Sequence, residues 1–375
     1  MGQRLRLLRE GIRNRAARGV SLPLTVMSVA FPFAPVGPCG AGSAERILSE
    51  LDAALVAEGQ RSLVVACAGS LVAGELFSAP MPERALISES DRRWHRWRFQ
   101  AAIDRALSRY RVDLIHMHGV DFDQHVLPSG IPVLVTLHMP IGWYRPEAWV
   151  TFGDRAQFQC VSVAQRSTCA GLVNVPVIEN GVPLPNVRLD REREDFALAL
   201  GHISTEKNLH EALEAATRAG TRVLVGGHVF PYREDGEYFS EKVQPLLNRE
   251  DVEHRYLGPI DAVRRQRLLA RAKCLLQSSR APETTSLTAM DALAVGTPVI
   301  AYRSGALAEI VEDGVTGYLV DNVEEMAGAI QRVGKIRAED CRAAAERRFS
   351  RDRMVRNYFD LYAAMVRREH VMMSA

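Results

Sequence analysis

The sequence contains no apolar run long enough to span a bilayer. No stretch of 18 or more apolar residues occurs in the 375 residues, and a transmembrane helix needs about 20. The opening segment, MGQRLRLLREGIRNRAARG, also lacks the apolar core of a secretory signal. We therefore expect a cytoplasmic protein whose Arg-rich segment 1–22 is either a cationic extension or a helix that lies on a membrane surface.

A strong charge of either sign is absent as well. The 47 basic and 45 acidic residues give a net charge of +2, which argues against a nucleic-acid partner. The six cysteines show neither the spacing of a metal site nor that of a small disulfide-rich domain, and no acidic metal pair is present. We expect a reducing compartment and no metal or other cofactor. Lysine is scarce, so each of the four lysines stands out: Lys207, Lys242, Lys273 and Lys335.

Short apolar, β-rich runs alternate with helical patterns along the whole chain, which predicts parallel sheets covered by helices. In the first half we expect strands over 24–31, 61–68, 112–119, 131–138 and 157–164. The Pro- and charge-rich stretch 176–195 marks a domain boundary. We predict an α/β fold of two Rossmann-like doubly wound domains, 23–183 and 184–350, facing a central cleft. A C-terminal helix over 351–375 should pack back toward the first domain.

The stretch APETTSLTAMDALAVGTPVIAYRSG, residues 281–305, places an acid on the buried stripe of a helix. Asp291 lies four residues after Leu287, on the same helical face. With a helix that begins near Thr284, the first-turn amides would form a seat for phosphate. Glu283 stands about two turns before Asp291, roughly 12 Å, which suits the sugar, diphosphate and ribose of a nucleotide sugar. The alternative is that Glu283 caps the helix and Asp291 pairs with a buried arginine.

The run PETTSLTAMDALAVGTPVIAYRSGALAEIVEDGVTGYLV resembles the donor-binding segment of glycosyltransferase family 4, whose members are retaining enzymes of the GT-B fold. ALALGHISTEKNLHEALEAA, VIENGV, GAGSAE and VTLH agree with the family in order and spacing, so the resemblance covers most of residues 24–365. It implies a metal-independent hexosyltransferase that uses a UDP- or GDP-type donor. The acceptor would be a saccharide, a lipid-linked molecule or a small molecule, in cell-envelope or polysaccharide biosynthesis.

The resemblance also implies roles for individual residues. Lys207 would neutralise the leaving phosphate, Glu283 would contact the donor sugar and His138 would lie near the transferred sugar; these three are the catalytic candidates. Asp291 would hold the ribose. The full donor-binding set is Gly42, Ser43, His202, Lys207, Gly258, Ile260, Glu283, Ser286, Leu287, Thr288 and Asp291. His116 and His118, which end a strand at the cleft, are expected to contact the acceptor.

The chain departs from the family pattern at four positions. The usual second Glu is Asp291, the usual Arg is His202, the usual Gly-Gly is Gly42-Ser43, and the usual Pro-Phe-Gly is Thr284-Thr285-Ser286. The alternative function is therefore a GT-B-shaped protein that binds nucleotide sugars and has weakened catalysis. Donor turnover separates the two.

The stretch DRRWHRWRFQAAIDRALSRY, residues 91–110, interleaves arginines with Trp94 and Trp97. Tryptophan and cations together suit a lipid headgroup region, and we predict a peripheral membrane contact through this helix. The alternative is that the tryptophans pack on the sheet while the arginines face water.

Overall fold

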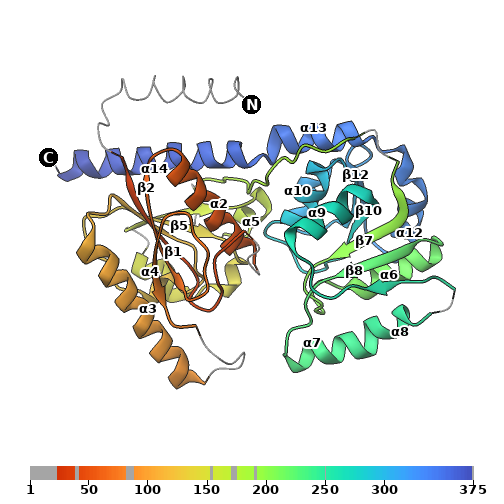
Figure 1. Cartoon of the computed structure of the whole chain (residues 1–375), viewed down its shortest axis with the longest axis horizontal. Coiled ribbons are helices and arrows are strands. Elements are labelled where there is room, and N and C mark those ends of the chain that lie inside the picture. Colours follow the sequence, from red (N-terminus) through yellow and green to blue (C-terminus); the bar gives the residue numbers. More distant parts are fainter. Residues whose placement is uncertain are drawn as a thin grey trace.

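The computed structural model describes residues 23–38, 42–81, 88–152, 155–169, 175–189, 192–249 and 251–373, so the prediction for segment 1–22 lies outside the described residues. The chain forms two halves, each built on a six-stranded sheet in which the paired strands are parallel (Figure 1). Sheets of this kind are covered on both faces, which explains the nearly continuous apolar runs in the sequence. The predicted α/β fold of two doubly wound domains is confirmed.

The N-terminal sheet has the strand order β3-β2-β1-β4-β5-β6. Its strands are β1 (Thr25–Val29), β2 (Arg61–Cys67), β3 (Glu75–Ala79), β4 (Leu114–Met117), β5 (Val133–Leu137) and β6 (Ala156–Cys160). The helices of this half are α2 (Ser43–Ala57), α3 (Glu89–Arg109), α4 (Pro146–Phe152) and α5 (Val163–Ser167). The sequence analysis missed β3, an edge strand whose face is only partly buried and therefore carries a weak apolar signal.

The C-terminal sheet has the order β12-β11-β10-β7-β8-β9, which is the same topology read from the other edge. Its strands are β7 (Glu194–Leu200), β8 (Arg222–Gly226), β9 (Arg255–Tyr256), β10 (Ala272–Gln277), β11 (Val299–Tyr302) and β12 (Gly317–Val320). Its helices are α6 (Leu209–Arg218), α7 (Arg233–Tyr238), α8 (Gln244–Leu247), α9 (Ala262–Arg271), α10 (Leu287–Ala294), α11 (Leu307–Ile310), α12 (Val323–Arg332) and α13 (Ala338–Arg348). In both sheets the order reverses between the first and fourth strands, and ligands bind beyond the carboxyl ends of strands at such a switch point.

The chain crosses between the two halves twice, and the crossings touch each other. Val182 donates its amide to Phe349 and accepts from Arg351. A Cβ at Gly181 would come within 2.7 Å of the Ser350 carbonyl oxygen, so only glycine allows this approach. After the second crossing, α14 (Arg351–Met373) runs back along the N-terminal half (Figure 1).

The buried apolar residues form two main clusters, one of which joins the two halves. One buried cluster fills the N-terminal half, from Met27 to Val175. The larger cluster surrounds the C-terminal sheet and continues through Tyr358 of α14 to Ile47 of α2. The two halves are therefore joined by packing as well as by the chain. Among the described residues, no helix combines the length and apolar character needed to cross a bilayer.

Helix α3 turns its tryptophans outward. Phe99 and Ile103 are buried against the domain, whereas Trp94 is 49% exposed and Trp97 is 62% exposed. The Arg98 guanidinium lies 5.7 and 5.8 Å from the two indole rings. The alternative in which these tryptophans pack on the sheet is wrong.

Candidate active site

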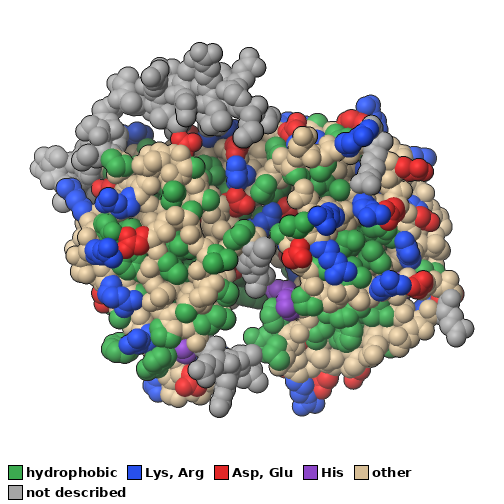
Figure 2. Space-filling view, in the orientation of Figure 1, with side chains coloured by type: hydrophobic (Ala, Val, Ile, Leu, Met, Phe, Trp, Pro, Cys, Tyr) green, Lys and Arg blue, Asp and Glu red, His purple; other side chains and the backbone are tan. Residues whose placement is uncertain are grey.

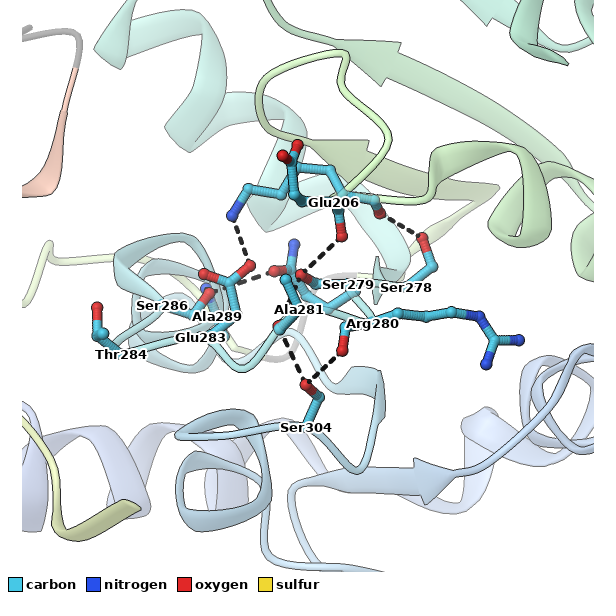
Figure 3. Close-up of polar contacts among 12 residues, drawn as sticks. Glu206, Ser278, Ser279, Arg280, Ala281, Glu283, Thr284, Ser286, Ala289 and Ser304 are labelled. Carbon is cyan, nitrogen blue, oxygen red and sulfur yellow. Dashed lines mark hydrogen bonds and ion pairs between the residues drawn. The ribbon is translucent and has the colours of Figure 1, made fainter. Parts of the chain in front are cut away.

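Two loops meet at the switch point of the C-terminal sheet. Residues 201–208 follow β7 and residues 278–286 follow β10, the neighbouring strand. The Ser278 hydroxyl donates to the Lys207 carbonyl at 3.1 Å, and the Ser279 hydroxyl donates to the Glu206 carbonyl at 3.1 Å. On the other side, Ser304 donates to the Ala281 carbonyl at 3.0 Å (Figure 3). The first two bonds fix the two loops against each other, and the third ties the 278–286 loop to the segment after β11.

The two loops bring a lysine and a glutamate together. Lys207 Nζ lies 2.5 Å from Glu283 Oε1, with the side chains 32% and 14% exposed. Asn208 holds the turn that carries the lysine: it adopts a left-handed φ of 53° and donates its side-chain amide to the Ser278 carbonyl at 3.2 Å. Lys207 is therefore a fixed cation of the site and not a freely solvated charge at a helix start.

Helix α10 begins later than predicted, at Leu287 instead of near Thr284, because Ser286 is its N-cap. The Ser286 hydroxyl accepts from the Ala289 amide at 3.3 Å. The first-turn amides are thus those of Leu287, Thr288 and Ala289, which have no carbonyl one turn earlier in the helix. The expectation that Glu283 caps this helix is wrong, since Glu283 pairs with Lys207.

Asp291, the acid on the buried stripe of helix α10, pairs with an arginine of the other domain. Asp291 accepts from Arg46 of α2 through both carboxylate oxygens, at 2.6 and 2.7 Å. Arg265 of α9 lies 3.6 Å from the same carboxylate. The part of the alternative that pairs Asp291 with an arginine is confirmed, although Arg46 is partly and not fully buried, with its side chain 11% exposed. An additional ribose contact by Asp291 stays a prediction.

Glu45, in the first turn of helix α2, accepts hydrogen bonds from the backbone at the start of that helix. Gly42 is the N-cap and Ser43 is the first helical residue. Burial raises the pKa of Glu45, while hydrogen bonds from the Glu45 and Gly42 amides oppose the rise. Glu45 thus already accepts from the backbone that was predicted to approach a diphosphate. That approach stays a prediction.

His138 follows β5 directly, and its loop is held through three consecutive carbonyls. Gln165 of α5 donates to the Leu137 carbonyl at 2.6 Å and to the Met139 carbonyl at 2.9 Å. Thr284 donates across the domain interface to the His138 carbonyl at 2.8 Å. Sequence reasoning missed Gln165, although Ser162 and Gln165 have the spacing of a helix capping box.

The three strand-end histidines form a buried stack. His118 Nδ1 and His138 Nε2 are 3.0 Å apart, and the His116 and His118 ring centroids are 3.9 Å apart. Burial lowers the pKa of His138 to about 3 and lowers those of His116 and His118 well below the ordinary value. All three are therefore neutral near pH 7.

The assignment of His116 to an acceptor site is wrong. This side chain is fully buried, with Tyr362 of α14 2.7 Å from Nδ1 and Thr136 2.7 Å from Nε2. Helix α14 covers it. His118 is also buried, at 3% exposure, and it contacts His138, which is itself only 1% exposed.

The remaining candidates lie around the ends of β7, β8 and β9. His202 packs edge-on against Phe230, with ring centroids 4.7 Å apart. Gly258 has a φ of 67° and accepts from the Gly227 amide at 3.0 Å, and Ile260 packs beside Gly226. These residues therefore share one edge of the sheet with the Lys207 loop.

Figure 2 shows a hollow between the two halves. Two surface pockets, of about 280 and 460 Å³, lie at the opposite edges of the sheets, beside residues such as Glu194 and Asp113. Within the described part of the chain, no group of three or more His, Cys, Asp or Glu side chains is placed to hold a metal ion.

Each half of the chain matches a known protein family. The family described as "Glycosyltransferase Family 4" matches residues 44–184, and the family described as "Glycosyl transferases group 1" matches residues 184–349. The chain belongs to the GT-B glycosyltransferases and is family 4-like. The resemblance found in the sequence is thereby confirmed.

The relatives of this glycosyltransferase cover only part of its length. It is 26% identical over 272 residues to a glycogen synthase of Mycobacterium tuberculosis, which is 64% of this chain and 63% of the relative. It is 28% identical over 145 residues to an alpha-monoglucosyldiacylglycerol synthase of Streptococcus pneumoniae, 37% of this chain and 31% of the relative. The glycosyltransferase thus spans less than two thirds of these relatives.

Solved structures share the fold over nearly the whole glycosyltransferase. AviGT4, a glycosyltransferase involved in avilamycin A biosynthesis, aligns with a TM-score of 0.68 at 23% identity, covering 92% of this chain and 98% of that one. Anabaena HepE in complex with UDP-glucose aligns with a TM-score of 0.69 at 18% identity, covering 90% and 99%. At these identities the likeness establishes the fold alone.

Proposed function

We propose that this glycosyltransferase moves a hexosyl group from a UDP- or GDP-type sugar to a saccharide, lipid-linked or small-molecule acceptor. Transfer would retain the anomeric configuration and need no metal. The observation that carries the proposal is the order of groups beside β10: the Lys207–Glu283 pair, then the first-turn amides of α10, then Asp291. A nucleotide sugar has matching parts in this order, namely sugar hydroxyls, diphosphate and ribose hydroxyls.

The chemistry follows from that order. Lys207 and the α10 amides would stabilise negative charge on the departing diphosphate, the kind of interaction that contributes most when it is in place before the reaction. The departing phosphate oxygen would take the proton of the acceptor hydroxyl as that hydroxyl attacks from the same face. His138, whose pKa burial lowers to about 3, would act as a neutral hydrogen-bonding group beside the transferred sugar.

The related proteins support this choice of ligands. HepE was solved with UDP-glucose and also with UDP and glucose, and the name of the pneumococcal relative refers to a glucosylated diacylglycerol. A role in cell-envelope or polysaccharide biosynthesis is consistent with these neighbours and belongs to the same proposal.

Titration of the full chain with UDP, GDP and a panel of their sugars, monitored by calorimetry, tests donor binding. Turnover with saccharide and lipid acceptors follows, and NMR of the product reads the anomeric configuration. Transfer with retention is expected. Tight binding of a nucleotide sugar without transfer or donor hydrolysis would instead support the alternative, a binding protein with weakened catalysis. Failure to bind any nucleotide would refute both.

We also propose that the protein works in the cytoplasm and binds the membrane peripherally through α3. The exposed rings of Trp94 and Trp97 stand beside Arg98, and Arg92 and Arg93 are exposed on the same helix, an arrangement that suits anionic headgroups. Sedimentation with anionic vesicles should fall in the variant with Trp94→Ala and Trp97→Ala, and Trp143→Ala, which removes an exposed tryptophan elsewhere, is the control. Equal, negligible binding to anionic and neutral vesicles would refute the contact.

A further inference from the structure

The ion pair between Arg46 and Asp291 joins the two domains across the hollow. Arg46 belongs to α2 and Asp291 to α10, 245 residues later in the chain, and their side chains are 11% and 14% exposed. Both terminal nitrogens of Arg46 meet the carboxylate, at 2.6 and 2.7 Å. A bidentate pair of this kind fixes the plane of the carboxylate as well as its position.

Arg46 leaves part of the carboxylate available to a ligand. An ionised carboxylate has about four lone-pair sites, and a bidentate arginine uses about one on each oxygen. The sites that remain suit two vicinal hydroxyls, such as those of a ribose. Arg265 of the C-terminal domain lies 3.6 Å from the same carboxylate, so Asp291 faces a guanidinium group from each domain.

Further contacts cross the domain interface near His138. Thr284 donates to the His138 carbonyl at 2.8 Å, and Glu309 of the C-terminal domain accepts from the amides of Val163 and Ala164 at the start of α5. Helix α5 carries Gln165, which holds the His138 loop. Closure of the two domains at Arg46 therefore accompanies the placement of His138.

We propose that Arg46 is a positioning residue that orients the Asp291 carboxylate toward the ribose of the donor and draws the N-terminal domain onto the bound nucleotide. This inference rests on the proposed donor site. Arg46 acts through Asp291, so its removal should weaken nucleotide binding and domain closure together. It should raise the donor KM more than it lowers kcat. In Arg46→Lys the charge remains and the bidentate geometry is lost, so that variant should be intermediate.

The test uses the full chain and the nucleotide, UDP or GDP, that the unaltered protein binds. We expect Arg46→Ala to bind it at least tenfold more weakly, and X-ray scattering to show less compaction on nucleotide addition. The control is Arg351→Ala, because Arg351 lies 3.6 Å from Glu50 of the same helix α2 but on the α14 side; it should change the affinity less than twofold. The double variant Arg46→Ala/Asp291→Ala should bind no more weakly than Asp291→Ala alone.

Other results would overturn the proposal. Unchanged nucleotide binding by Arg46→Ala would mean that Arg46 does not position Asp291 for the nucleotide, and tighter binding would mean that Arg46 competes with the donor for Asp291. Additive losses in the double variant would mean that Arg46 acts independently of Asp291. Should Arg46→Ala fail to fold, Arg46→Lys gives the same comparison, and wild-type affinity in that variant would count against a bidentate role. Absence of nucleotide binding by the unaltered protein would refute the proposed function itself, a distinguishable outcome.

Discussion

Replacing Lys207 with alanine is the sharpest test of the chemistry. The lysine is fixed by Glu283 at 2.5 Å and by the Ser278 hydroxyl at its own carbonyl, so its charge is in place before a donor arrives. Removal of one such charge-stabilising donor costs roughly 2–4 kcal/mol of transition-state stabilisation. We therefore expect kcat to fall by about 30- to 1,000-fold.

In Lys207→Ala, the free energy of unfolding should change much less than the activation free energy for transfer. The Lys207–Glu283 pair is partly exposed, with the lysine side chain 32% exposed, and after allowance for screening such a pair contributes roughly 0.5–1 kcal/mol to folding. The Tm of Lys207→Ala should fall by no more than about 3 °C. Calorimetric melting and steady-state turnover on the same preparation measure both quantities.

Lys273 offers a matched control for this variant. Its ammonium also pairs with an acid, Asp195 at 3.2 Å, and its side chain is 29% exposed, but it lies at the start of β10 on the opposite edge of the sheet. Lys273→Ala should leave kcat within twofold. A Lys207→Ala enzyme with unchanged kcat, or an equal loss in both variants, would refute the assigned role.

Three further predictions concern the neighbouring groups. Asp291→Glu should lower Tm, by an overpacking cost of roughly 1–3 kcal/mol, because the carboxylate already touches both Arg46 nitrogens; a melting scan showing unchanged or raised stability contradicts this. Gln165→Leu leaves two carbonyls beside His138 without their donor, so kcat should fall about tenfold while UDP affinity changes less than twofold; an equal loss of both would point to general damage. Between pH 6.5 and 3 the unfolded chain binds a proton at His138 that the folded chain does not. The free energy of unfolding should therefore decrease as the pH is lowered, by about 2 kcal/mol from this group at pH 5. Urea unfolding at pH 7.5 and at pH 5 should show a smaller difference in the free energy of unfolding for His138→Gln than for the unaltered protein.

Local pattern was enough to predict the sheets and the donor-side motif. Parallel strands that are buried on both faces leave continuous apolar runs, whereas the half-buried edge strand β3 leaves none. The spacing of Glu283 and Asp291 is likewise a local property, and so is the position of Lys207 after β7. The start of α10 was misplaced by three residues because Thr284, Thr285 and Ser286 are all capable caps, and the structure uses Ser286.

Contacts between distant segments were beyond local pattern. Alternation along β4 puts His116 and His118 on one face of the sheet, but the sequence does not show that α14, more than 200 residues later, covers His116. The partner of Asp291 is similarly remote. That a buried acid needs a partner is a general rule; that the partner is Arg46 depends on how the two domains face each other.

The two ion pairs of the site differ in a way that bears on the order of events. Lys207 and Glu283 belong to the same domain and are joined by loops that are bonded to each other, so their pairing is independent of domain closure. Asp291 depends on closure, because Arg46 reaches it from the other domain and Arg265 alone lies 3.6 Å away. Separating the domains would remove the bidentate partner of Asp291 and leave Arg265 of the same domain beside the carboxylate. In the proposed donor site, the half assigned to the sugar would therefore be organised before the donor enters, and the half assigned to the nucleoside would be completed only as the domains meet.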